Sequence, residues 1–174
     1  MMRMLILGAA IFALTAGSSL AQEESTNRVA AKTDWSVFVE QNPTECWGVS
    51  APKETVNTRD GRVVAVRRGD ILLFVTFRPG DGVQGEVSFT GGYPFANGST
   101  VTLQVDDTSY ELFTDGEWAW PATEADDAKI TTSMKRGTNA ILTARSSRGT
   151  ITKDTFSLLG FTAAVEEVER RCGG

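Results

Sequence analysis

The 174-residue sequence contains no histidine and only two cysteines. Without histidine, the chain lacks the commonest general base of enzymes and the commonest protein ligand for metals. A Ser-His-Asp triad and a Cys-His site are therefore excluded, and a zinc site would depend on carboxylates and two distant thiols. The chain also lacks a phosphate-binding loop and a dinucleotide-binding glycine fingerprint. These absences predict a protein without a cofactor or bound metal and without a recognisable catalytic set.

Positive charge is in the minority, because 17 lysines and arginines stand against 22 acidic residues and give a net charge of −5. An acidic balance argues against nucleic acid and anionic membrane surfaces as general partners. The main apolar run, residues 5–16, is shorter than the ~20 residues of a membrane-spanning helix. We therefore expect no transmembrane segment in the mature chain.

The first residues are organised like a secretory signal peptide. Arg3 supplies a positive start, residues 5–16 an apolar stretch, and Ser19 and Ala21 the small side chains before a cleavage site. We predict a signal peptide over residues 1–21, a flexible polar leader over 22–33, and a single domain over 34–174. The exported protein would lie in the periplasm or on the outer surface of the cell.

Export determines how the two cysteines, Cys46 and Cys172, are interpreted. Oxidising compartments favour disulfides, so we predict that these residues form one, with two buried free thiols as the alternative. The two cysteines are 126 positions apart in the sequence. A disulfide that closes a loop of this length stabilises a fold by roughly 4–5 kcal/mol in the chain-entropy model.

Short strands punctuated by turns occupy most of the chain. Strands or hairpins are predicted in residues 34–40, 46–52, 71–77, 83–95, 99–113, 114–120 and 139–158. A short helix is predicted within residues 122–138. This pattern indicates a mainly β protein, an antiparallel β-sandwich or a partly open barrel, with a C-terminal α-helix packed on it.

The C-terminal segment is predicted to be an amphipathic helix that begins near Thr162 as its N-cap. Its apolar residues recur at period 3.6 and are Phe161, Val165, Val168 and Cys172. Cys172 should therefore face the core, where Cys46 on an early strand can meet it.

Aromatic residues are the candidates for partner contact. Trp118 and Trp120 should project from the same face of a strand, as either a binding platform or part of the core. Tyr93 and Phe95 flank a proline and form either an exposed aromatic corner or a structural one. Trp47 should point away from the face that carries Cys46.

Two other motifs have a weaker functional interpretation. The acids Asp106, Asp107, Asp126 and Asp127 could serve a hydrolase or bind Ca²⁺, although solvated acids in a turn and at a helix start are the preferred interpretation. The Arg68-Gly69-Asp70 tripeptide would act in adhesion only if it protruded, and a simple turn also accounts for it.

Several stretches resemble the invasion-associated locus B family of Gram-negative bacteria: "CWGVSAP", "GGYPF", "SMKRGT" and above all "SSRGTITKDTFSLLGFTAAVEEVERRC". The resemblance spans residues 35–172. It implies an exported periplasmic or envelope-associated protein, in a family whose founding members are linked to host-cell invasion, and it supplies no catalytic residue or cofactor.

These observations favour a non-enzymatic, disulfide-stabilised envelope protein that binds an envelope protein or a glycan. The alternative is a carboxylate-dependent hydrolase acting on an envelope or extracellular substrate. Two carboxylates converging in a cleft at ~5–10 Å would favour the hydrolase. An exposed aromatic patch without such a pair would favour binding.

Overall fold

The computed structural model describes residues 27–173, so the predicted signal peptide lies outside the described part of the chain. This part contains twelve strands, two α-helices and one 3-10 turn, η1 (Pro79–Asp81). The strands are β1 (Arg28–Lys32), β2 (Trp35–Gln41), β3 (Thr44–Ser50), β4 (Glu54–Arg59), β5 (Arg62–Val63), β6 (Leu72–Arg78), β7 (Val83–Thr90), β8 (Thr100–Val105), β9 (Thr108–Asp115), β10 (Trp118–Trp120), β11 (Asn139–Arg145) and β12 (Ile151–Ser157). The helices are α1 (Glu124–Arg136) and α2 (Phe161–Cys172).

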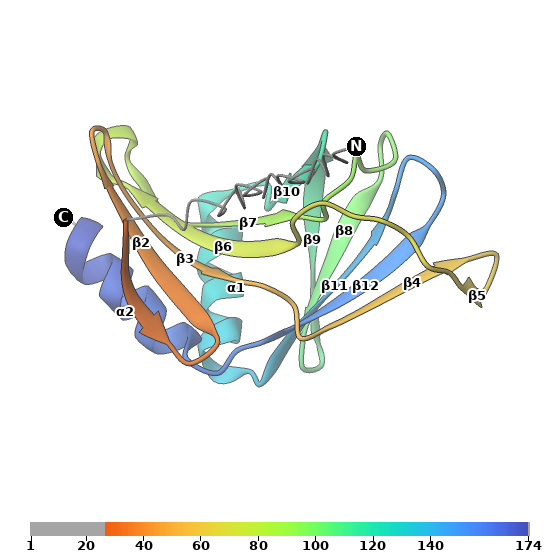
Figure 1. Ribbon diagram of the computed structural model, residues 1–174. Coiled ribbons are helices and arrows are strands. Elements are labelled where there is room, and N and C mark those ends of the chain that lie inside the picture. The colour runs from red at the N-terminus through yellow and green to blue at the C-terminus, as the bar shows by residue number, and fades with distance from the viewer. Residues whose placement is uncertain (1–26, 174) are drawn as a thin grey trace, which may run out of the picture.

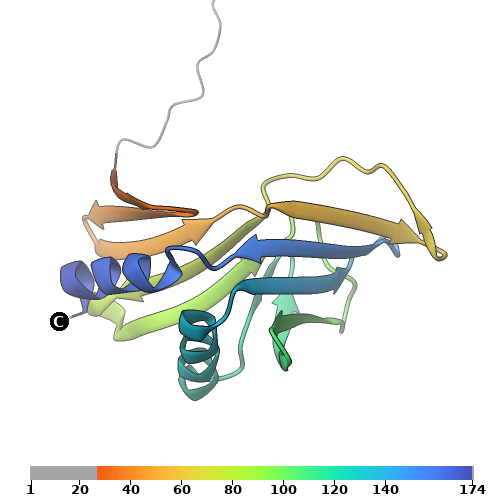
Figure 2. The same cartoon turned by 90° about the horizontal axis from the view of Figure 1, so that it is seen from below.

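All twelve strands belong to one open sheet in the order β1-β2-β3-β6-β7-β10-β9-β8-β11-β12-β4-β5. Figures 1 and 2 show that the sheet is strongly bent, with β2, β3, β6 and β7 in one half and β8, β11, β12 and β4 in the other. The right-handed twist of successive strands accumulates and curls so wide a sheet. The prediction of a mainly β, antiparallel protein with a C-terminal helix is confirmed. The strands form a single open sheet.

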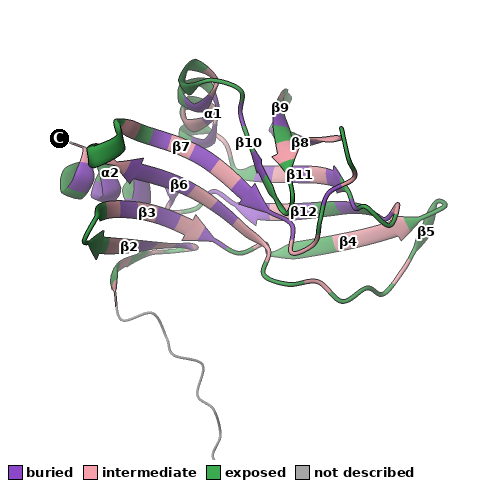
Figure 3. Ribbon diagram, turned by 90° about the horizontal axis from the view of Figure 1, so that it is seen from above, coloured by how far each residue is buried: buried purple, intermediate pink, exposed green. Residues whose placement is uncertain are grey.

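The core lies where the inner faces of the two halves meet. Buried and less buried residues alternate along β6 and β7, as Figure 3 shows. Phe89 of β7 and Phe156 of β12 are fully buried, and their rings meet edge to face at 6.2 Å. Because β7 and β12 are separated by four strands in the sheet, this contact closes the bend.

Both helices cover the inner face of the first half. α2 packs against β3, β2 and β6, whereas α1 packs against β7 (Figure 2). The predicted short helix is α1, and Ile130 and Met134, four residues apart, are its fully buried apolar contacts. Its N-terminus is capped by Thr123, whose hydroxyl accepts a hydrogen bond from the backbone N–H of Asp126.

The predicted disulfide is present and joins Cys46 of β3 to Cys172 at the end of α2. The apolar face of α2 is buried as the sequence predicts, and the ring of Phe161 lies 4.8 Å from that of Trp35. Glu167, also buried, pairs with Arg170, Arg171 and Lys32. Hydrogen bonds from the two arginines lower the pKa of Glu167 to about 2.

The prediction that Thr162 caps α2 is wrong. The N-cap is Gly160, whose φ of 90° lies in the left-handed region. A Cβ atom at this position would lie 1.8 Å from the carbonyl oxygen of Lys32, so only glycine fits. Thr162 instead donates its hydroxyl hydrogen bond to the carbonyl of Lys135.

The predicted flexible leader is wrong over Arg28–Lys32, which forms β1 and pairs with β2. The composition of this segment, RVAAK, gives no clear strand pattern, and its order comes from hydrogen bonding to β2. The domain boundary at residue 34 otherwise stays a prediction.

The region after β3 also differs from the expectation. β4 was not anticipated, because its polar sequence ETVNTR carries little apolar alternation. It is ordered by pairing with β12. Residues 63–66 are all apolar, yet only Val63 belongs to a strand, and residues 64–71 form a connection that leads back to β6.

Candidate functional site

Trp118 and Trp120 lie on the outer face of the sheet. They occupy the two ends of β10, with exposed fractions of 43% and 38%, while Ala119 between them is fully buried. Their assignment to the core is therefore wrong. β10 runs between β7 and β9, so both indoles stand in the middle of the sheet face, away from its edges.

Two further aromatic residues join them in a groove of about 350 Å³. Because Cys46 faces α2, its neighbour Trp47 must face outward, as the alternation along a strand requires. Phe74 of β6 stands on the same face, with its ring 5.7 Å from that of Trp118. Trp47 is held by a parallel stack with Phe38 at 5.6 Å. The groove thus presents three indoles and one phenyl ring.

One end of the groove carries charge. Arg78 of β6 donates to Glu45 at 3.4 Å and to Glu86 at 3.0 Å, and all three residues line the groove. Thr76 and Ser88 add hydroxyl groups to its floor. An aromatic floor with a few polar groups at one end is the usual construction of a small-molecule site.

The other two predicted contact residues, Phe95 and Tyr93, differ in their exposure. Phe95 is 4% exposed, and its ring packs against Phe89 and Tyr93. Phe95 is therefore a core residue, and its prediction as a contact residue is wrong. Its backbone is fixed by a bridge to Ser146 and by a hydrogen bond from its N–H to the carbonyl of Gly116, and the ring faces the core. Tyr93 is only partly buried and lines a second pocket, at the place where β4 and β11 end and β12 begins.

The adhesion hypothesis for residues 68–70 fails on Arg68. Its guanidinium makes two parallel hydrogen bonds to Asp154, at 2.7 and 2.6 Å, and the two side chains are 6% and 0% exposed. It also lies over the ring of Tyr93, 5.0 Å from the centroid. Burial raises the pKa of Asp154, and the contact with Arg68 opposes that rise. Arg68 is thus held inside the fold and cannot be presented to a receptor.

The candidate catalytic acids do not form a site. Asp106 and Asp107 lie in the tight turn between β8 and β9, and Asp126 pairs with Lys129 on α1. Asp127 is buried and accepts a hydrogen bond from the N–H of Val87 at 2.8 Å. Burial raises the pKa of Asp127 to about 6. None of the four lines either pocket.

Two absences within residues 27–173 complete this description. No cluster of three or more histidine, cysteine or acidic side chains could hold a metal ion there. Within the same residues, no helix has the length and apolarity needed to cross a membrane.

Fold and site together define a class: a one-sheet antiparallel β protein, closed by a disulfide and carrying an exposed aromatic groove. The model of the Invasion associated locus B (IalB) protein family matches residues 35–169, and the chain belongs to this family. Family and disulfide together indicate an extracytoplasmic protein.

The fold is similar to that of invasion associated protein B from Bartonella henselae, known from a crystal structure. The two chains are 17% identical, with a TM-score of 0.55, and the match covers 81% of this chain and 95% of the other. At this identity the likeness concerns the fold alone. Comparison with curated protein sequences gives no match.

Sequence reasoning missed the partners of the two tryptophans. Trp47 had a usable signal, its position beside an inward cysteine, whereas Phe74 lies in a run without clear alternation, LLFVTFR. Glu45, Arg78 and Glu86 are brought together only by the pairing of β3, β6 and β7.

Proposed function

We propose that the protein is a non-enzymatic binding module of the bacterial cell envelope, and that the aromatic groove binds a glycan. The observation that carries this proposal is a set of three indoles on one sheet face, of which Trp118 and Trp120 are exposed and Trp47 is partly buried. A large aromatic side chain that is exposed to solvent forgoes the stabilisation that it would gain by burial in the core. A ligand with flat apolar faces accounts for them.

The position of the groove favours a glycan over an extended peptide. Its floor is formed by β3, β6, β7 and β10, all interior strands of the sheet. Their backbone groups pair with one another, so a peptide cannot add as a further strand there. Recognition must use side chains, and sugar rings offer C–H faces for the indoles and hydroxyls for Arg78, Glu45 and Glu86.

The hydrolase alternative has one candidate pair of carboxylates in this groove, Glu45 and Glu86. The guanidinium of Arg78 contacts both. It therefore occupies the space between them, where a glycosidase would place the scissile bond. The family is not a known enzyme family. Both points support binding without turnover.

A glycan array probed with the purified protein tests the proposal. Hits are then titrated by intrinsic fluorescence, which reports on the groove because three of the four tryptophans line it. We expect Trp118→Ala/Trp120→Ala to weaken binding at least about tenfold, as the loss of central aromatic contacts does. Leu159→Ala, which truncates an apolar side chain 60% exposed outside the groove, is the matched control and should bind normally.

Three results would contradict the proposal. They are the absence of any glycan ligand, binding that the tryptophan variant leaves unchanged, and cleavage of the bound glycan that Glu86→Gln abolishes. Photocrosslinking from position 118 in intact envelopes distinguishes a protein occupant, which would appear as one covalent adduct. Cell fractionation and N-terminal sequencing test export, with residue 22 expected first and the protein in the periplasm or on the outer surface.

A further inference from the structure

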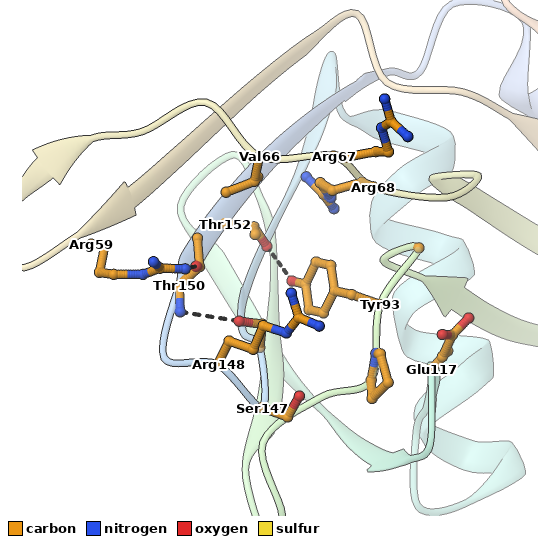
Figure 4. Close-up of a pocket in the computed structure, with 13 residues that line it drawn as sticks. Arg59, Val66, Arg67, Arg68, Tyr93, Glu117, Ser147, Arg148, Thr150 and Thr152 are labelled. Carbon is orange, nitrogen blue, oxygen red and sulfur yellow. Dashed lines mark hydrogen bonds between the residues drawn. The ribbon is translucent and has the colours of Figure 1, made fainter.

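A second cavity, of about 470 Å³, lies where three connections meet: residues 64–71, the turn at Gly92–Pro94, and the turn between β11 and β12 (Figure 4). Four arginines line it, namely Arg59, Arg67, Arg68 and Arg148. The only acidic residue in the lining is Glu117. So many cations around one cavity are unexpected in a chain whose net charge is −5.

Only one of these arginines is neutralised by the fold. Arg68 is paired with Asp154 behind the cavity wall. Arg59 donates to the hydroxyl of Thr150 at 2.7 Å, which leaves its charge uncompensated. Arg67 and Arg148 make no hydrogen bond or ion pair within residues 27–173. Figure 4 shows Arg148 beside Tyr93, with Arg59 reaching toward Thr150 from the other side.

The charge count leaves an excess of about two. Four guanidinium groups face the carboxylates of Asp154 and Glu117, and arginine stays protonated throughout the physiological range. Arg59, Arg67 and Arg148 are exposed to solvent, and the excess of positive charge that they carry attracts an anion. A dianion compensates it fully, whereas a single carboxylate or sulfate ester compensates half.

The wall also offers hydroxyl groups and a rigid frame. Ser147, Thr150 and Thr152 line the cavity, and the hydroxyl of Thr152 bonds that of Tyr93 at 2.5 Å. Two hydrogen bonds fix the turn that carries Arg148. The backbone N–H of Thr150 donates to the hydroxyl of Ser146, and the backbone N–H of Ser146 donates to the carbonyl of Thr150. The backbone of this turn and the hydroxyl of Thr152 are thus held in place before a ligand arrives, whereas the side chain of Arg148 is free to move onto the ligand.

We propose that this cavity binds a phosphomonoester, with Arg59, Arg67 and Arg148 on the phosphate group. Arginine presents a planar fork of donors that matches phosphate oxygens. The volume exceeds that of a phosphate ion and suits an organic body such as a sugar ring. Tyr93, Pro94 and Val66 supply apolar wall for that body. This site is separate from the aromatic groove and does not depend on its function.

Isothermal titration calorimetry with the purified protein tests the proposal, with inorganic phosphate, glucose 6-phosphate and glucose 6-sulfate as probes. We expect glucose 6-phosphate to bind more tightly than glucose 6-sulfate. Its affinity should fall at pH 5, where the phosphate, with a second pKa of about 6, loses one charge. Arg67→Gln and Arg148→Gln should each weaken binding at least about tenfold, since each removes a charged hydrogen bond.

Arg136→Gln is the matched control, because Arg136 is exposed on α1 and does not line the cavity. The thermal midpoint should stay unchanged in all three variants, and Arg148→Lys should restore part of the affinity. Equal affinity for the sulfate and phosphate esters, binding insensitive to Arg67 and Arg148, or no binding of any probe would each overturn the proposal.

The phosphomonoester could be soluble or could be a lipid headgroup. Phosphatidylcholine vesicles with and without phosphatidic acid, sedimented with the protein, separate the two sources. Retention by phosphatidic acid that Arg148→Gln abolishes would identify the headgroup. Binding of glucose 6-phosphate without vesicle retention would identify a soluble ligand.

Discussion

Removing the disulfide between Cys46 and Cys172 should destabilise the protein by a large and calculable amount. The bridge closes a loop with a sequence separation of 126 residues. The chain-entropy relation then gives about 5 kcal/mol at 25 °C, because the cross-link restricts the unfolded chain. Reduction of the wild-type protein should therefore lower the thermal midpoint by about 10–20 °C, at 2–4 °C for each kcal/mol. Cys46→Ala/Cys172→Ala should lose roughly 1–2 kcal/mol more, because two buried sulfur atoms leave a cavity.

Urea denaturation of the oxidised, reduced and doubly substituted proteins measures these differences. The slope of the unfolding free energy against urea should rise on reduction, since the unlinked unfolded chain exposes more surface. Ligand binding at either proposed site should persist in the reduced protein under conditions where it stays folded. If reduction changed the unfolding free energy by less than about 1 kcal/mol, the loop-closure account of this disulfide would be refuted.

Three further substitutions test local features of the fold. Asp127→Asn should be more stable than wild type at pH 7 by up to about 3 kcal/mol, with the gap closing toward pH 4. The reason is that burial raises the pKa of Asp127 from 3.8 to about 6 in the native state. Between pH 3.8 and 6 the native carboxyl holds a proton that the unfolded chain has lost, so the stability of the wild type falls as the pH rises through this range. Parallel urea curves at pH 4, 5.5 and 7 check this, and a constant gap would contradict it. Asp154→Asn should lower the free energy of unfolding by about 3–5 kcal/mol, because it leaves Arg68 buried without its acidic partner. Arg68→Met/Asp154→Leu should lower it by less, and a larger loss in this double variant would contradict the explanation. Gly160→Ala should cost at least about 2 kcal/mol in urea denaturation, because its Cβ would meet the carbonyl of Lys32, and a near-neutral result would mean that α2 begins elsewhere.

The two proposed sites adjoin at the start of β10. Glu117 lines the arginine cavity, and the next residue, Trp118, lines the aromatic groove. Cross-titration of a glycan hit and glucose 6-phosphate will show whether occupancy of one site alters affinity at the other.

The sequence by itself determined the features that depend on local pattern. Alternation and turn residues established a mainly β chain, and period 3.6 placed Phe161, Val165 and Cys172 on one helix face. The scarcity of cysteine left a single possible pairing once export was inferred. These features need only neighbours along the chain or the arithmetic of composition.

The tertiary structure decided which faces are covered. Alternation places Trp118 and Trp120 on one face of a strand without saying whether that face is buried, and the general preference of large aromatic residues for the core favoured the wrong alternative. The strand order settles it: the helices cover the face that carries Cys46, and the opposite face stays open. The gathering of Arg59, Arg67 and Arg148 around one cavity likewise depends on the tertiary structure, because β4 pairs with β12 and so brings the end of β4 beside the turn between β11 and β12.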